Sequence, residues 1–184
     1  MPARDAEGTR TRILDAALSE FAAVGFAGGR VERIARTADA NVRMIYAYFG
    51  GKTELFDAAV RAAVEQMTAT VPPDPQDLHA WAGRLFDYHQ HDPAALRISL
   101  WAQLERPESA AEPLQAYMAK TTAVSATTGD TTRAIDLLAI VYAIAQAWIL
   151  TPTALLSTDG TDPASPERIA LHRERIVEAV RAIS

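Results

Sequence analysis

The sequence contains no cysteine, which excludes disulfide bonds and thiolate metal sites. Aromatic residues make up only 7% of its 184 residues, whereas hydrophobic residues together reach 49%. Alanine and leucine supply most of that hydrophobic content, and both are strong helix formers. Because aromatic side chains are enriched in strands, their scarcity here also favours an all-α fold.

The chain also lacks the long apolar runs of exported or membrane proteins. Residues 1–12, MPARDAEGTRTR, are polar and do not resemble a signal peptide. The most apolar segment, 134–150, carries Asp136 and Gln146 and is short for a membrane span. We therefore expect a cytoplasmic protein without membrane contact.

No arrangement of residues in the sequence predicts catalysis. It offers no nucleophile–base pair, no phosphate-binding glycine loop and no metal-binding cluster. The stretch DYHQHD holds two histidines, but His89 and His91 are two positions apart and cannot share a helix face. Asp87 and His91 can share one, yet two ligands make a poor metal site. We expect no metal and no cofactor, and an α-helical enzyme remains an unfavoured alternative.

The formal net charge is −5, but the charge is unevenly distributed. Within residues 30–52, five cations face two acids: Arg30, Arg33, Arg36, Arg43 and Lys52 against Glu32 and Asp39. A local basic patch of this kind is compatible with nucleic-acid binding, although many charge runs are simply solvated faces.

Apolar spacing in the first 70 residues predicts helices over 9–24, 31–38 and 42–49, then a longer helix through 55–67. Gly25 is suited to end the first helix, because glycine tolerates left-handed φ. Asn41 is a favourable N-cap for the third helix. Two short helices separated by a tight turn are the outline of a helix-turn-helix.

The segment 71–77, VPPDPQD, is proline-rich and cannot continue a helix. Beyond it we expect helices after Pro75, Pro93 and Pro113, one over 132–150 and one over 166–183, for about nine helices in all. The helix after Pro113 is expected to fade into a threonine-rich stretch at 121–132, and 156–166 is expected to be a polar loop. We divide the chain into an N-terminal helix-turn-helix domain, 1–52, and a larger helical domain, 53–184, with the helix from about residue 52 as the link.

Residues 9–64 contain a series of motifs in a fixed order: Ile13-Leu14-x-x-Ala17, Gly25-Phe26, Ile34-Ala35, Ile45-Tyr46-x-Tyr48-Phe49-x-x-Lys52 and Leu55. In order and spacing these motifs resemble the DNA-binding domain of TetR-family transcriptional regulators. The resemblance implies a DNA-binding regulator, commonly a repressor, with a second domain that binds an effector and dimerises. Three positions depart from the usual pattern. Gly29 and Arg30 replace a Thr-Ser/Thr pair, Asp39 replaces a glycine, and Arg43 replaces a small residue.

The third helix is the expected recognition helix. Ile45 and Phe49 are four residues apart and are expected to face the core. By the resemblance, Tyr46, Tyr48 and Lys52 contact the DNA backbone, and Arg43 lies where it can read a base. The full set of candidate DNA contacts is Arg30, Arg33, Asn41, Val42, Arg43, Met44, Tyr46, Tyr48 and Lys52. Within this set Asn41 is equally interpretable as a cap only, Val42 as core and Met44 as surface.

The second domain offers aromatic and polar side chains for an effector site. The candidates, which can equally well fill the core, are Trp81, Phe86, His89, Trp101, Gln103, Tyr117, Met118, Tyr142 and Gln146. The last two long helices are the expected dimer interface, because segment 134–150 has more apolar surface than one partner helix can cover. The sequence thus predicts a dimer on near-palindromic double-stranded DNA, released by a small molecule. Control by a protein partner, suggested by the weakly helical stretch 121–132, is the alternative.

Overall fold

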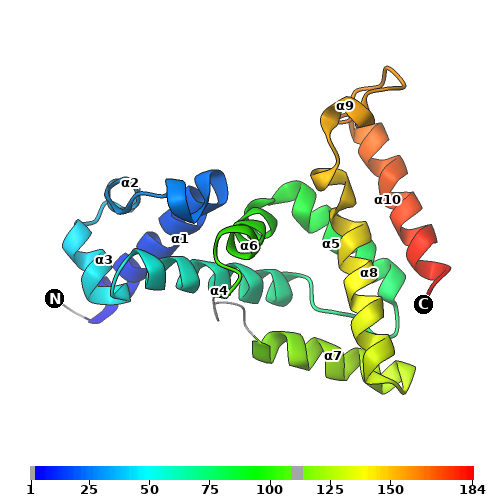
Figure 1. The fold of residues 1–184 in the computed structure, drawn as a ribbon, viewed down its shortest axis with the longest axis horizontal. Coiled ribbons are helices and arrows are strands. Elements are labelled where there is room, and N and C mark those ends of the chain that lie inside the picture. Colours follow the sequence, from blue (N-terminus) through cyan, green and yellow to red (C-terminus); the bar gives the residue numbers. More distant parts are fainter. Residues whose placement is uncertain (1–2, 109–113) are drawn as a thin grey trace. The chain divides into compact units, whose positions relative to one another are not determined.

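The computed structural model describes residues 3–108 and 114–184, and these residues form ten α-helices and no strand (Figure 1). The all-α prediction is confirmed. Nine helices correspond to those expected from the sequence, and the tenth is a single turn, α9, which ends at Leu156, where the segment expected to be a loop begins. The bounds are α1 Ala3–Gly28, α2 Val31–Thr37, α3 Val42–Phe49, α4 Lys52–Thr70, α5 Leu78–His91, α6 Ala94–Glu105, α7 Leu114–Thr128, α8 Thr131–Leu150, α9 Thr153–Leu156 and α10 Pro166–Arg181.

The described residues form two compact units. The first combines α1, α2, α3, most of α4 and α6, and the second combines α5 with α7–α10. The helix α6 therefore belongs to the compact unit of the N-terminal helices, although it follows α5 in the chain. Which segment binds DNA is a separate question, and the division at about residue 52 stays a prediction.

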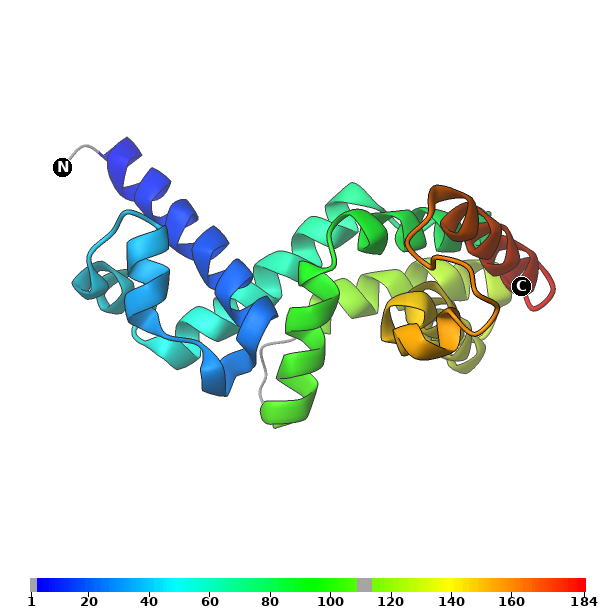
Figure 2. The ribbon, with the colours of Figure 1, turned by 90° about the horizontal axis from the view of Figure 1, so that it is seen from above.

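The first unit is built around the buried face of α1. Ile13, Ala17 and Phe21 have no exposed surface, and they lie among the equally buried Ile34 of α2 and Phe56 of α4. The rings of Phe21 and Phe56 meet edge to face with centroids 5.0 Å apart. In both ribbon views α2 and α3 lie beside α1 (Figures 1 and 2). This small core fixes the position of α3.

At Gly25 the backbone leaves helical geometry, with φ 74° and ψ −178°, and one more turn follows to Gly28. The predicted helix break at this glycine is confirmed. A side chain here would also collide with α6, because a Cβ on Gly25 would lie 2.9 Å from the ring of Trp101. The same contact between α1 and α6 is held by Arg97, whose Nε donates to the carbonyl of Ala22 at 2.9 Å.

In the second unit α5 packs against α8 and α10, and α7 packs against α8. Trp81 and Phe86 of α5, Val141 of α8 and Ile176 of α10 supply buried apolar surface. Helices α5 and α10 are also joined by an ion pair, in which Nε of Arg173 lies 2.8 Å from both oxygens of Asp87. The side chains of Asp77, Asp130 and Ser165 cap α5, α8 and α10.

Two expectations about helix ends need correction. Helix α5 begins at Leu78 with Asp77 as its cap, two residues later than a start directly after Pro75. Helix α7 continues through the threonine-rich stretch to Thr128, because Lys120 and Val124 are buried on one face of it and packing outweighs weak propensity. By contrast Ser165 and Pro166 begin α10 as expected, with the Ser165 side chain accepting from the backbone N–H of Arg168. Pro113 lies outside the described residues.

Helix α8 is buried on one face only. Its opposite face exposes Ile135, Ile140 and Leu150, with Ala139 and Ala143 between them. Among the described residues this is the one helix long and apolar enough to cross a membrane, with a mean hydropathy of 1.6 over its best window. One such helix is a weak indication, because packed helices of globular proteins meet the same criteria.

Candidate nucleic-acid interface

The turn between α2 and α3 is built from two short polar side chains. Asp39 takes the left-handed conformation, with φ 48°, at the position where the sequence departs from glycine. Aspartate tolerates this region better than most residues. Asn41 then caps α3, because its side chain accepts from the backbone N–H of Arg43 at 2.8 Å. The helix-turn-helix and the Asn41 cap are confirmed.

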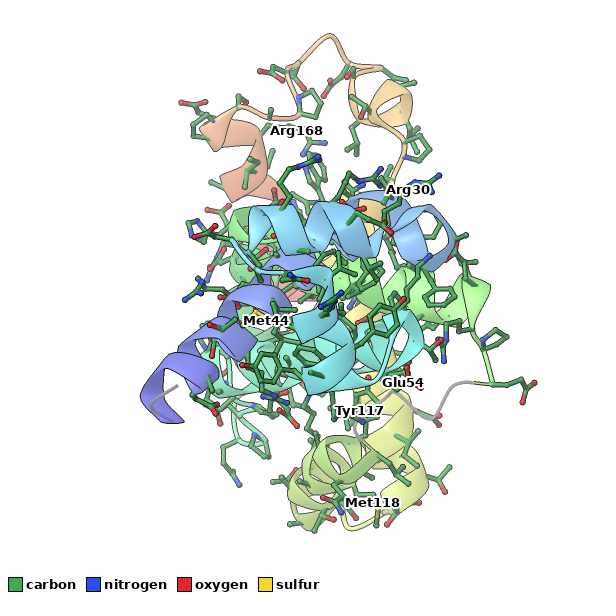
Figure 3. The ribbon with its side chains drawn as sticks, turned by 90° about the vertical axis from the view of Figure 1, so that its left-hand side faces the viewer. Arg30, Met44, Glu54, Tyr117, Met118 and Arg168 are labelled. Carbon is green, nitrogen blue, oxygen red and sulfur yellow. The ribbon has the colours of Figure 1, made fainter. Side chains whose placement is uncertain are left out.

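The faces of α3 are clearly distinguished. Ile45 is fully buried, as expected, whereas Phe49 is only half-buried beneath the guanidinium of Arg10, 5.2 Å from the ring centroid. On the opposite side Arg43 is exposed and Tyr46 is 55% exposed. The remaining candidates on this helix, Val42, Met44 and Tyr48, are half-buried (Met44 is labelled in Figure 3).

The start of α2 is held by Glu20 of α1. Arg30 is the N-cap residue and makes no side-chain capping bond, but its backbone N–H donates to the Glu20 carboxylate at 2.9 Å. This bond holds the cap residue in place, but it does not replace a capping hydroxyl, which would accept from an N–H in the first turn of α2. The Arg30 side chain is left exposed (Figure 3). Gly29 is required for close packing, because a Cβ there would lie 2.4 Å from the ring of Phe21.

Arg33 forms an ion pair with the same carboxylate. Its Nε donates to both oxygens of Glu20, at 2.8 and 3.1 Å, and its Nη2 donates to the carbonyl of Gly28 at 2.9 Å. Burial raises the pKa of Glu20, but the hydrogen bonds and charges of Arg33 and Arg30 outweigh it, so the pKa lies below its ordinary value. The guanidinium of Arg33 therefore joins α1 to α2.

Lys52 is the first residue of α4 and is half-buried. Its ammonium lies 4.7 Å from the ring centroid of Phe26 and donates weakly to the carbonyl of Ala27, at 3.4 Å. The guanidinium carbon of Arg106 lies 4.8 Å from the centroid of the same ring. Lys52 thus lies at a helix N-terminus, where a phosphate would be favoured, with its ammonium over an aromatic ring.

The structure brings only some of the effector candidates together. The rings of Trp81 and Tyr142 meet edge to face at 5.6 Å, and Tyr117 lies close to the same place. Phe86 belongs to a second cluster with His172 and Trp148. Of the other candidates, His89 is buried, Gln146 half-buried and Met118 60% exposed, while Trp101 and Gln103 belong to α6 in the first unit.

Sequence reasoning missed one residue at the centre of the aromatic cluster. The ammonium of Lys120 donates to the Tyr142 hydroxyl at 2.8 Å and lies near the rings of Tyr117 and Tyr142. A signal for it exists in the sequence: Lys120 follows Tyr117 by three residues and precedes Val124 by four, so all three share a helix face. A lysine in such a stripe is ordinarily assigned to the surface, so the pattern alone does not single it out.

Comparison with known proteins agrees with this geometry. Residues 13–59 match the family described as bacterial regulatory proteins, tetR family, and residues 77–182 match the tetracyclin repressor-like C-terminal domain. The chain belongs to the tetR family. This tetR-family chain is 36% identical over 192 aligned residues to the HTH-type transcriptional repressor SCO4008 of Streptomyces coelicolor, covering 100% of the chain and 98% of the relative.

Two solved structures extend the comparison. SCO4942 of Streptomyces coelicolor matches with a TM-score of 0.80 and 32% identity, covering 95% of this chain and 97% of that one. The multidrug binding protein EbrR, complexed with imidazole, matches with a TM-score of 0.62 and 25% identity, covering 97% and 90%. The tetR family consists of bacterial regulatory proteins, and SCO4008 and SCO4942 are both named as transcriptional regulators, so this chain is a DNA-binding transcriptional regulator and not an enzyme.

Proposed function

We propose that the protein is a dimeric repressor that a small molecule releases from a near-palindromic operator. The observation that carries the proposal is α3 itself. Asn41 caps the helix and the buried Ile45 anchors it, so that Arg43 and Tyr46 are presented to solvent on a fixed frame. In a helix-turn-helix the second helix enters the major groove, where arginine pairs bidentately with guanine.

We assign base reading to Arg43 and DNA-backbone contacts to Tyr46, Tyr48 and Lys52. Arg30, whose side chain is exposed beside the start of α2, serves as a further phosphate contact. Arg33 serves chiefly to position α2, because its guanidinium is held by Glu20. The groove-facing surface is completed by Asn41, Val42 and Met44. Residues 1–52 thus form the proposed DNA-binding domain, and residues 53–184 the proposed effector-binding and dimerisation domain.

Dimerisation through α8 and α10 is supported by their exposed apolar side chains. Ile135, Ile140 and Leu150 line the open face of α8, and α10 exposes Leu171. A second copy related by a two-fold axis would cover this surface with an identical one. The two recognition helices would then read half-sites about 34–36 Å apart, one turn of DNA.

Small-molecule control is supported by the tetracyclin repressor-like match of residues 77–182 and by the likeness to a multidrug binding protein. By linkage, effector and operator would then weaken each other's binding by the same factor. Control by a protein partner is the alternative. The sequence argument for it, that the stretch 121–132 is weakly helical, is weaker now because α7 is helical through Thr128. A regulator of this kind acts on the chromosome, so we place it in the cytoplasm.

Selection of bound DNA from a random pool tests the proposal. We expect a near-palindromic consensus with half-sites about one helical turn apart, bound by two protomers with strong salt dependence. Asymmetric sites bound by one protomer would contradict the dimer, and the absence of any enriched sequence would contradict the operator. Release of the selected DNA by a compound, without any added protein, would favour small-molecule control over protein control.

A further inference from the structure

The second unit buries a lysine among aromatic rings. Lys120 of α7 is only 4% exposed, and its helix neighbour Val124 is fully buried. The ammonium donates to the Tyr142 hydroxyl at 2.8 Å and lies 5.6 Å from the ring centroid of Tyr117 and 5.4 Å from that of Tyr142. Among the residues that the structure describes, no carboxylate lies within ion-pair distance of it.

This arrangement leaves the ammonium short of partners. Lysine is almost never fully buried unless it is paired, because a buried charge loses its hydration. An ammonium has three N–H donors, and the Tyr142 hydroxyl accepts one of them. Aromatic faces attract a cation but replace an anion only partly. Burial accordingly lowers the pKa of Lys120 to about 8, which still leaves the group mostly protonated at neutral pH.

The groups around Lys120 are those that recognise an aromatic anion. Because the Tyr142 oxygen accepts from Lys120, its own O–H can be donated to a second acceptor. Trp81 meets the Tyr142 ring edge to face, with its indole N–H already used by the carbonyl of Val71. Tyr117 and Tyr142 remain partly exposed, so that the cluster can be approached along their rings (Tyr117 is labelled in Figure 3).

We propose that Lys120 is the anion-binding group of the effector site and that the effector is an aromatic carboxylate. The carboxylate accepts from the Lys120 ammonium and the Tyr142 O–H, while the ring packs against the partly exposed rings of Tyr117 and Tyr142. A monoanion fits better than a phosphate ester, whose second charge would remain uncompensated in a buried site. A cationic ligand would be repelled. The inference rests on the proposed function in one respect, that the second unit binds a small molecule.

The sequence provides an unusually direct probe, because Lys52 and Lys120 are its only lysines. Protein labelled with ¹³C at the lysine ε-carbon gives two NMR signals, and Lys52 serves as the internal reference. The probes are 2-naphthoate, its neutral analogue 2-naphthamide, and the cation 2-naphthylmethylammonium. We expect naphthoate to shift the Lys120 signal and raise the pKa of its amine, to leave Lys52 unmoved, and to bind at least about tenfold more tightly than naphthamide.

Substitutions test the roles of the individual groups. Lys120→Met replaces the ammonium with an apolar side chain of similar length and should equalise the affinities for acid and amide. Lys120→Arg should retain a preference for the acid, and Tyr142→Phe should weaken it without abolishing it. The Tyr142→Phe protein and the wild-type titration keep the test decisive if Lys120→Met does not fold. Equal binding of acid and amide by the wild type, or a Lys120 signal unmoved by millimolar naphthoate, overturns the proposal.

Operator release separates this inference from the proposed function. If naphthoate shifts the Lys120 signal but leaves operator DNA bound, the anion site is supported. The proposal that a ligand at that site releases the operator is then contradicted. If naphthamide or the cation releases the DNA and naphthoate does not, ligand control stands and the assignment of Lys120 is overturned. Release by naphthoate in the wild type, lost in Lys120→Met, supports both.

Discussion

Both carboxylate oxygens of Glu20 on α1 accept from Nε of Arg33 on α2, at 2.8 and 3.1 Å. The same carboxylate accepts from the first backbone N–H of the α2 cap, that of Arg30, at 2.9 Å. One acidic side chain thus fixes both the start and the orientation of α2. Because α2 packs on α3, the position of the recognition helix depends on a residue that is not expected to touch DNA.

Glu20→Gln should lower the thermal midpoint of unfolding and weaken operator binding. The amide retains one acceptor but loses the charge that pairs with Arg33. Since the pKa of Glu20 in the folded protein is depressed, its contribution is present above the unfolded pKa and is lost as pH falls through the folded value. Thermal melts at pH 7 and pH 3 should therefore differ less for the variant than for the wild type. Glu65→Gln, an exposed change on α4, is the control and should leave both measurements unchanged.

Replacing Arg43 and replacing Lys52 should weaken DNA binding in different ways. Arg43→Ala should lose about 1–3 kcal/mol of discrimination at one base pair, because the bidentate contact to a base edge is removed. Lys52→Ala should weaken binding to all DNA sequences alike, and it should reduce the slope of log K against log salt concentration by about one. Titrations over a salt series, on the selected operator and on single-base variants, measure both. Arg61→Ala, an exposed change farther along α4, is the control. The contact assignments are wrong if neither affinity nor selectivity changes.

Gly25→Ala should destabilise the protein by about 2–4 kcal/mol, because φ 74° with ψ −178° is a backbone conformation adopted essentially by glycine alone and because the added Cβ overpacks the contact. The φ of Gly25 is 74°, and an added Cβ would lie 2.9 Å from Trp101. Gly129 is a matched control, because its φ is 71° and a Cβ there would meet nothing within 4 Å. Gly129→Ala should therefore cost only the strain, about 1–2 kcal/mol. Denaturant unfolding of both variants measures the difference, and equal losses would mean that α6 does not pack on α1 as closely as described.

The local signals in the sequence predicted the helix-turn-helix in detail. The capping side chain of Asn41, the buried position of Ile45 and the left-handed turn at Asp39 all depend on neighbours in the chain. The contacts that could not be predicted join distant segments. No local pattern shows that Phe21 closes over Gly29, that Glu20 accepts from the backbone N–H of Arg30, or that Trp101 lies on Gly25.

The second unit was harder to predict because its burial pattern departs from residue type. Lys120 is buried although lysine normally marks a surface, and Met118, two residues earlier, is exposed although it extends the apolar stripe. Helix α7 continues past the point where propensity weakens, because packing on α8 stabilises it. Such outcomes depend on which helix lies opposite, and one sequence does not specify that.

His89 should make stability depend on pH in mildly acidic solution. It is 1% exposed, and neither ring nitrogen has a hydrogen-bond partner within residues 3–108 and 114–184. Burial lowers its pKa from 6.5 to about 4 despite the opposing charge of Asp92. Between these values the unfolded chain binds more protons, so stability should fall as pH drops from about 6.5 to 4, by on the order of 2–3 kcal/mol. Urea unfolding at several pH values measures this slope.

His89→Leu should flatten the slope and match or exceed the wild-type stability at pH 7, because it removes two unpaired buried nitrogens. His91→Gln changes an exposed histidine of the same helix and should keep the slope. Some slope should remain in His89→Leu, since burial also lowers the pKa of His172. A wild-type protein equally stable at pH 7 and pH 5 would show that His89 is solvated rather than buried.

Ala143→Arg should convert the proposed dimer to monomers. Ala143 lies on the exposed face of α8 between Ile135, which is 51% exposed, and Leu150, which is 50% exposed. A stable interface buries about 1,200–2,000 Å² in total, and an unpaired charge near its centre is costly to desolvate. Sedimentation should therefore give one protomer for the variant and two for the wild type, and the variant should bind a full palindrome no better than a half-site. Ala126→Arg, an exposed change on α7, should remain dimeric. The opposite pattern would move the interface from α8 to α7, and with it the spacing of the recognition helices.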